Sequence, residues 1–163
     1  MEIEGRAIVV SGGGSGIGRA AVLALAGRGA KVIVADLDET GGRQTVDLAG
    51  AKGGVAVFRH CDVTRTEDLA GAFACAFEHF GRLDVAFNNA GSGGEDLFAD
   101  DPGDWAKVID IDLTAVIDAT RIAAREMRRS GRGGVIINTA SMGGLLPMAG
   151  SPVYAAAKAG VVN

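Results

Sequence analysis

The chain has 163 residues, of which 48% are apolar and 22% charged, a balance typical of one globular domain that buries a core, so a disordered chain is excluded. A formal net charge of −4 and an aromatic content of 5% disfavour a nucleic-acid-binding surface, which needs basic patches and stacking rings. We therefore expect a single domain over residues 1–163 whose partners are small molecules and not nucleic acids.

Short apolar runs rich in β-branched residues alternate with helical patterns along the whole chain. The apolar runs predict strands at residues 6–11, 31–36, 55–60, 83–89 and 134–141. The helical patterns predict helices at about 16–28, 39–51, 66–80 and 104–130, the last with a possible break, and from about Pro152 onward.

This alternation is typical of βαβ units, and the almost continuously apolar strands indicate helices on both faces of a parallel sheet. We predict an α/β fold with a doubly wound parallel sheet of Rossmann type and strand order 3-2-1-4-5. In such a fold a cofactor crosses the carboxyl edge between strands one and four, where the strand order reverses.

A glycine-rich turn follows the first predicted strand and opens the first helix. Its pattern is G-x-x-x-G-x-G through Gly12, Gly16 and Gly18, with Ser15 and Ile17 between them. Glycines let a pyrophosphate approach the N–H groups at a helix N-terminus. A P-loop is excluded, because Arg-Ala and not Lys-Ser/Thr follows the last glycine. A nucleotide site and a tight turn without a ligand both fit the pattern.

Asp36 ends the second predicted strand about 20 residues after Gly16, the spacing at which a carboxylate receives the ribose hydroxyls of a dinucleotide. A carboxylate there repels the 2′-phosphate of NADP, and no basic residue stands at Ser15 or Leu37 to offset it. The pattern favours NAD over NADP. The alternative is a solvated strand-end carboxylate. Asp62, after the third strand, is either an adenine contact or a turn residue that caps a helix.

Neither the cysteines nor the long uncharged segment suggests a metal site or a membrane anchor. Cys61 and Cys75 have no metal-binding or redox spacing, so we expect buried thiols in a reducing cytoplasm. The N-terminal MEIEGR is charged and predicts no secretory signal. Residues 133–157 carry no charge and are long enough to span a bilayer, but glycines, Pro147 and Pro152 interrupt them. These breakers predict a strand, a loop and a helix start, and no membrane span.

Tyr154, the only tyrosine, is followed by Lys158 at a spacing that places both side chains on one helix face. A phenol ionises near pH 10, and a nearby ammonium group stabilises the phenolate, so such a pair can exchange a proton at lower pH. Ser141 ends the fifth predicted strand and could donate a hydrogen bond to the same substrate oxygen. The alternative for Ser141 is an ordinary turn residue.

Through these motifs the chain resembles the short-chain dehydrogenase/reductase family, of its classical type. The glycine turn resembles TGxxxGIG, with Ser11 in place of the threonine, and residues 88–91 read NNAG. Residues 154–158 match YxxxK, and residues 61–63 resemble the segment that contacts adenine. The resemblance extends over essentially the whole chain.

The resemblance implies reversible hydride transfer between NAD(H) and a secondary alcohol or ketone, in a homo-oligomer if the protein is full length. It implies that Tyr154 is the catalytic acid/base, that Lys158 holds the nicotinamide ribose, and that Ser141 orients the substrate oxygen. The implied cofactor-binding residues are Gly12, Ser15, Gly16, Ile17, Gly18, Asp36, Leu37, Asp62, Val63, Asn88, Ala90 and Gly91, together with Tyr154 and Lys158.

The chain departs from the family pattern in two ways. Asp112 stands where the family carries a catalytic asparagine, and because the two side chains are nearly isosteric we expect Asp112 to keep that place in the proton relay. Family members are also longer, so we expect a truncated domain without the last family strands. A non-catalytic nucleotide-binding module or an inactive truncated gene product is therefore the alternative function.

Overall fold

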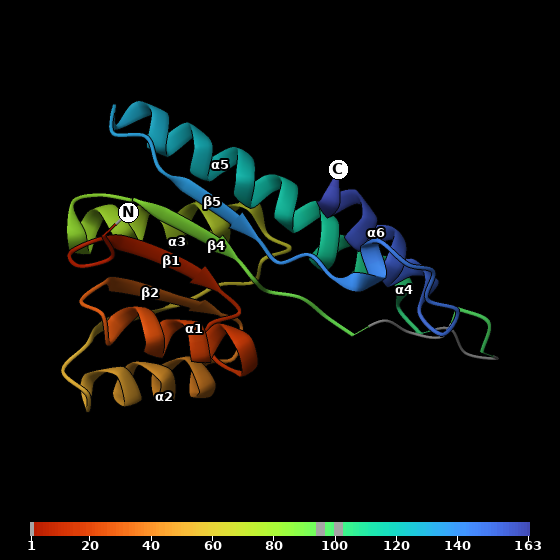
Figure 1. Ribbon diagram of the computed structural model, residues 1–163, viewed down its shortest axis with the longest axis horizontal. Coiled ribbons are helices and arrows are strands. Elements are labelled where there is room, and N and C mark those ends of the chain that lie inside the picture. The colour runs from red at the N-terminus through yellow and green to blue at the C-terminus, as the bar shows by residue number, and fades with distance from the viewer. Residues whose placement is uncertain (1, 94–96, 100–102) are drawn as a thin grey trace.

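The computed structural model describes residues 2–93, 97–99 and 103–163. Within them, five strands form one parallel sheet in the order β3-β2-β1-β4-β5, which confirms the predicted order (Figure 1). The strands are β1 (Ala7–Ser11), β2 (Lys31–Asp36), β3 (Val55–His60), β4 (Val85–Asn88) and β5 (Val135–Asn138).

Helices cover both faces of the sheet and also lie beyond the carboxyl ends of the strands (Figure 1). Helices α1 and α2 lie on one face, α3 and α5 on the other, and α4 and α6 beyond the strand ends. The helical elements are α1 (Gly16–Ala26), α2 (Glu39–Gly50), α3 (Thr66–Phe80), α4 (Trp105–Ile109), the π-helical turn η1 (Asp110–Thr114), α5 (Ala115–Arg129), the 3-10 turn η2 (Met142–Gly144) and α6 (Pro152–Val162).

The central strand β1 buries its two sets of side chains in two separate cores. In β1, Val10 packs with Val22 of α1 in the cluster on one face. Its neighbour Val9 packs with Phe73 of α3 and Ile122 of α5 in the cluster on the other face. Because successive strand residues point to opposite faces, a strand covered on both sides has no polar alternation. This packing explains the continuous apolar runs in the sequence.

The predicted helix at residues 104–130 is interrupted at the possible break. The interruption is η1, a turn with i→i+5 hydrogen bonds that joins α4 to α5. Such turns locally widen a helix and redirect its side chains. The middle residue of η1 is Asp112, which is fully buried.

The uncharged segment 133–157 forms β5, η2 and the start of α6. The predicted strand at 134–141 is shorter, because the ladder with β4 ends where Asn88 pairs with Asn138. β5 is an edge strand, with Val135 and Ile137 half exposed. Within the described ranges, no helix combines the length and the apolar character needed to cross a membrane.

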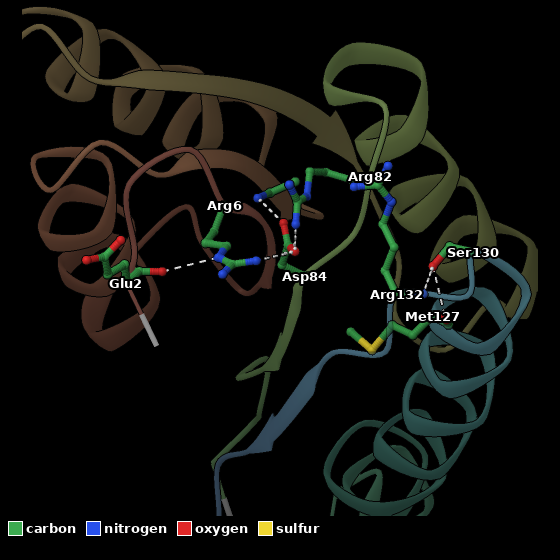
Figure 2. Close-up of polar contacts among 8 residues, drawn as sticks. Glu2, Arg6, Arg82, Asp84, Met127, Ser130 and Arg132 are labelled. Carbon is green, nitrogen blue, oxygen red and sulfur yellow. Dashed lines mark hydrogen bonds and ion pairs between the residues drawn. The ribbon is translucent and has the colours of Figure 1, made fainter.

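Asp84, directly before β4, joins the amino ends of β1 and β4 (Figure 2). One carboxylate oxygen accepts the N–H of Ala7 at 2.9 Å, and the other accepts hydrogen bonds from Arg6, at 3.2 Å, and from Arg82. Burial raises the pKa of Asp84, but the hydrogen bonds from Arg82, Ala7 and Arg6 together outweigh burial and lower this pKa below its ordinary value. A carboxyl group with a lowered pKa stabilises the fold above its unfolded pKa, and this stabilisation is lost as the pH falls through the folded pKa.

We expect Asp84→Asn to lower the free energy of unfolding at pH 7 by about 2 kcal/mol, because the amide leaves two half-buried guanidinium groups without a carboxylate. Urea unfolding followed by circular dichroism measures this loss. The difference between the two proteins should begin to narrow below about pH 4, where Asp84 of the unfolded chain takes up a proton, and should close as the pH falls through the lower pKa of the folded protein. Glu39→Gln, which breaks an exposed ion pair with Arg43, is the matched control and should cost less than about 0.5 kcal/mol. Equal losses in the two variants would contradict this role of Asp84.

Candidate functional site

A cavity of about 810 Å³ lies at the carboxyl ends of the strands. Its lining comes from the glycine turn after β1, the ends of β2 and β3, the loop after β4, η1 and α6. The sequence-predicted site residues that line it are Gly12, Ser15, Gly16, Ile17, Asp36, Leu37, Asp62, Val63, Ala90, Gly91, Asp112, Tyr154 and Lys158. The three predicted residues outside this lining are Gly18, Asn88 and Ser141.

The glycine turn packs directly against neighbouring backbone. Gly12 has a φ of +66°, and a Cβ atom there would lie 2.8 Å from the Cα atom of Ala90. A Cβ atom at Gly18 would lie 2.0 Å from the carbonyl oxygen of Gly12, so Gly18 seats α1 against the turn. Gly16 has a φ of +50° and no neighbouring atom within 4 Å of its Cβ position. The N-terminus of α1, whose first N–H groups lack intrahelical partners, therefore opens onto the cavity.

Asp36 is bound to the glycine turn and is not a freely solvated carboxylate. Its Oδ2 accepts the N–H of Gly14 at 2.7 Å, and its Oδ1 accepts the N–H of Asp38 at 2.9 Å. A Cβ atom at Gly14 would lie 2.8 Å from the same Oδ2, so this contact requires glycine. Each carboxylate oxygen keeps a lone pair that can accept a hydroxyl group from the cavity. Leu37, the next residue, is exposed at the cavity edge.

Asn89 joins the loop after β4 to the glycine turn. Its Nδ2 donates to the carbonyl oxygens of Ser11, at 3.2 Å, and Gly12, at 3.4 Å, while its backbone N–H donates to the hydroxyl of Ser11 at 3.0 Å. Its Oδ1 accepts the hydroxyl of Thr139 at 3.3 Å. Asn89 lines the cavity but was not among the predicted site residues, although the NNAG motif contains it.

Asn88 points away from the cavity. Its Nδ2 donates to Oδ1 of Asn138 at 2.8 Å and to the hydroxyl of Thr120 at 3.4 Å, and its side chain is buried. Asn88 is the last residue of β4, whereas Asn89 lies after the strand and binds the glycine turn. In this position Asn88 links β4 to β5 and α5.

The turn after β3 lines the cavity and is held by hydrogen bonds within the turn. Oδ1 of Asp62 accepts the hydroxyl of Thr64 at 2.7 Å and its N–H at 3.0 Å, and these bonds lower the pKa of Asp62. Asp62 is thus a turn residue, but it binds Thr64 and does not cap α3, whose N-cap is Arg65. Asp62 and Val63 also line the cavity. Burial, with smaller contributions from the carboxylates of Asp68 and Asp62, raises the pKa of the Cys61 thiol to about 12. Cys61 is therefore an uncharged part of the wall at neutral pH.

Tyr154 and Lys158 lie on α6, where their spacing predicted a shared helix face, and both line the cavity. Nζ of Lys158 lies 5.6 Å from the centre of the Tyr154 ring. It donates to the carbonyl oxygen of Thr139 at 3.1 Å. It also lies 3.1 Å from Oδ1 of Asp112, which makes an ion pair between two buried side chains. The ammonium group is thus held by the residue after β5 and by η1 as well as by its own helix.

Ser141 lies in the segment that packs on α6. Its hydroxyl oxygen accepts the N–H of Gly143 at 3.1 Å and caps η2. A Cβ atom at Gly144 would lie 2.6 Å from the carbonyl oxygen of Lys158, so the backbones of η2 and α6 are in close contact. Ser141 is therefore held near α6 by backbone packing, outside the cavity lining itself.

Two sets of residues with different chemistry line the cavity. The glycine turn and Asp36 offer N–H donors for a phosphate and a carboxylate for hydroxyl groups. Tyr154, beside an ammonium group, offers a site of proton exchange. Across residues 2–93, 97–99 and 103–163, no group of three or more His, Cys, Asp or Glu side chains is placed to hold a metal ion.

Known proteins match this chain over essentially its whole length. The family model described as short chain dehydrogenase matches residues 6–163. The 15-hydroxyprostaglandin dehydrogenase (NAD(+)) of Homo sapiens is 37% identical over 167 residues, covering 100% of this chain and 60% of the relative. The cyclohexanol dehydrogenase of Acinetobacter sp. (strain SE19) is 35% identical, covering 99% of this chain and 65% of the relative.

Solved structures of similar proteins have the same fold. A short chain dehydrogenase/reductase from Burkholderia phymatum in complex with NAD gives a TM-score of 0.93 at 35% identity, covering 99% of this chain and 58% of that protein. Levodione reductase gives a TM-score of 0.90 at 32% identity, covering 98% of this chain and 63% of that protein. The chain spans about 60% of the length of the curated relatives that it matches. With the motifs, the sheet order and the family match in agreement, the chain belongs to the short-chain dehydrogenase family.

Proposed function

We propose that this chain binds NAD and carries the proton-transfer group of an oxidoreductase that interconverts a secondary alcohol and a ketone. The observation that carries this proposal is that Tyr154 and Lys158 line the same cavity as the glycine turn and Asp36. Two relatives support the choice of cofactor, since one is named for NAD(+) and the other was solved with NAD bound.

The cavity residues fit a dinucleotide along its length. The open surface at Gly16 and the N-terminus of α1 suit the pyrophosphate, because both N–H groups and the helix dipole favour negative charge there. Asp36 would hold the hydroxyls of the adenine ribose, with Leu37 and Val63 beside the adenine. Tyr154 and Lys158 would then lie at the nicotinamide end.

When bound, NAD accepts a hydride in alcohol oxidation or, in its reduced form, donates one in ketone reduction. During oxidation Tyr154 acts as a phenolate and accepts the hydroxyl proton, while the carbinol hydrogen leaves with its electron pair and the carbonyl bond forms. During reduction Tyr154 returns the proton to the carbonyl oxygen. Lys158 would stabilise the phenolate through its positive charge and would bind the nicotinamide ribose.

Ser141 and the residues after it are proposed to form the substrate side of the site. The hydroxyl of Ser141 accepts one hydrogen bond from Gly143, so its own hydrogen is available to a substrate oxygen. Met142 and Leu145 follow Ser141 and are more than half exposed. These apolar side chains favour an alcohol with an apolar skeleton next to its hydroxyl group.

A nucleotide-binding module without turnover is the second candidate. It is favoured by the ion pair with Asp112, since a buried carboxylate already partners the ammonium group of Lys158. The two candidates share the cofactor site and differ in the role of Tyr154. Substitution of this residue therefore separates them.

We expect Tyr154→Phe to reduce turnover at least about 100-fold, because the ring is kept and only the proton-exchanging hydroxyl is lost. Steady-state oxidation of a panel of apolar secondary alcohols, including cyclohexanol, with NAD measures the loss. The dissociation constant for NADH, from nicotinamide fluorescence, should stay within about twofold and serves as the internal control. Unchanged turnover in the variant would place the acid/base elsewhere, and undetectable turnover in the wild type, with NADH bound, would favour the module.

We expect the wild type to bind NADH at least about tenfold more tightly than NADPH, because a 2′-phosphate would face the carboxylate of Asp36. Asp36→Asn keeps an oxygen that can accept the N–H of Gly14 but removes the charge, so it should narrow this gap about fivefold or more. Fluorescence titration with both nucleotides measures the ratio.

Asp47→Asn is the matched control, since Asp47 is an exposed carboxylate on α2 outside the cavity lining. This control should leave the NADH to NADPH ratio unchanged. A wild type that prefers NADPH, or an Asp36→Asn variant with the wild-type ratio, would contradict the role proposed for Asp36.

A further inference from the structure

Arg19, on α1, is hydrogen-bonded to both the glycine turn and α2. Its Nη2 donates to the carbonyl oxygens of Gly14 and, at 3.3 Å, of Gly41, and its Nε donates to the hydroxyl of Thr45 at 3.0 Å. A guanidinium group is planar and has several donors in a fixed geometry, so it can hold separate acceptors at set positions. No ion pair between described residues includes Arg19, so its described partners are neutral oxygens.

Thr45 connects this guanidinium group to the first turn of α2. Thr45 is fully buried, and its hydroxyl donates to the carbonyl oxygen of Gly41 at 2.9 Å while it accepts the hydrogen bond from Arg19. A Cβ atom at Gly41 would lie 2.9 Å from the carbonyl oxygen of Gly14, so the start of α2 packs directly on the glycine turn. Arg19 and Thr45 therefore hold α2 and the turn together where their backbones meet.

Gly14 is the residue through which Arg19 can act on Asp36. The carbonyl oxygen of Gly14 accepts from Arg19, whereas its N–H donates to Oδ2 of Asp36 at 2.7 Å. Glycine has little conformational preference of its own, so contacts with neighbours must fix its backbone. Asp36 lines the cavity, but Arg19 and Thr45 do not. Any effect of Arg19 on a bound nucleotide must therefore pass through Gly14 or act through its charge.

We propose that Arg19 is a positioning residue for cofactor selection, which fixes Gly14 so that the carboxylate of Asp36 stays directed at the adenine ribose. A carboxylate held by the N–H of Gly14 cannot turn away from a 2′-phosphate, so the repulsion is kept. A carboxylate without that bond can rotate toward solvent, where water and salt screen its charge. This inference rests on the role proposed for Asp36 and assigns to Arg19 the geometry on which that role depends.

The positive charge of Arg19 would act on the selection in the opposite direction. A cation near the adenine ribose attracts a 2′-phosphate, so loss of the charge alone would weaken NADPH binding and widen the preference for NADH. Loss of a positioning contact would instead narrow this preference. The sign of the change therefore separates the two roles.

The first test is the ratio of the dissociation constants of NADPH and NADH in Arg19→Met, measured by nicotinamide fluorescence. We expect this ratio to fall about threefold, because methionine has no donor for Gly14, Gly41 or Thr45. Arg28→Met, at an exposed arginine after the end of α1, is the matched control and should leave the ratio within about 1.5-fold. An unchanged or larger ratio in Arg19→Met would overturn the proposal.

An effect that passes through Asp36 must disappear when its charge is absent. In the Asp36→Asn background we expect Arg19→Met to change the ratio by less than about 1.5-fold, because residues that act through one contact are not additive. A fall of about threefold in both backgrounds would mean that Arg19 acts independently of Asp36, which would overturn the proposal.

Hydrogen exchange of the Gly14 amide, followed by NMR without nucleotide, tests the positioning directly. We expect this amide to exchange at least about tenfold faster in Arg19→Met, with the amides of β1 unchanged as the internal control. Wild-type protection of Gly14 in the variant would contradict the proposal.

Thr45→Val is the second variant, for the case in which Arg19→Met does not fold. It removes the hydroxyl partner of Arg19 without a change of charge, so the nucleotide ratio and the Gly14 exchange should move in the same directions as in Arg19→Met. Thr66→Val, which removes a hydroxyl bond of 2.9 Å from α3 to Asp118 of α5, is its control and should change neither. Failure of both test variants to fold would overturn a role confined to cofactor selection.

The outcomes also separate this inference from the proposed function. A wild type without a preference for NADH would refute the role of Asp36 and this inference together. A wild type that prefers NADH, with an Arg19→Met variant that keeps the wild-type ratio, would refute this inference alone.

Discussion

The cavity depends on the close contact between the glycine turn and the loop after β4. A Cβ atom at Gly12 would lie 2.8 Å from the Cα atom of Ala90, so the two backbones meet with room for a hydrogen atom only. β1 and β4 are neighbours where the strand order reverses. Asn89, after β4, is hydrogen-bonded to Ser11 at the end of β1. The carboxyl ends of all five parallel strands lie at this edge, so α6 and η1 can complete a cavity there.

Most of the fold could be predicted from local patterns of apolar residues in the sequence. The apolar run of β1 predicted a strand because helices cover both faces of the sheet there, as Val9 and Val10 show by packing in opposite cores. The break in the helix at 104–130 was anticipated, but its π-helical form was not. That form places Asp112 against Lys158, and no periodicity within a single helix encodes a contact with another helix.

The candidate site, like the fold, could be predicted from the sequence only in part. The pairing of Tyr154 with Lys158 follows from helical spacing, and the place of Asp36 follows from its position at a strand end. The partners of Lys158, which are Thr139 and Asp112, lie on other elements and are set by tertiary packing alone. The near-isosteric comparison of aspartate with asparagine concerns shape, whereas the ion pair of Asp112 with Lys158 depends on charge.

A crystal structure of the intact protein with bound NADH would show whether one cavity serves both cofactor binding and proton transfer. We expect the adenine ribose hydroxyls at the carboxylate of Asp36, the pyrophosphate at the N-terminus of α1, and the nicotinamide beside Tyr154 and Lys158. A nucleotide bound outside this cavity, or a nicotinamide placed away from the Tyr154 hydroxyl, would contradict it.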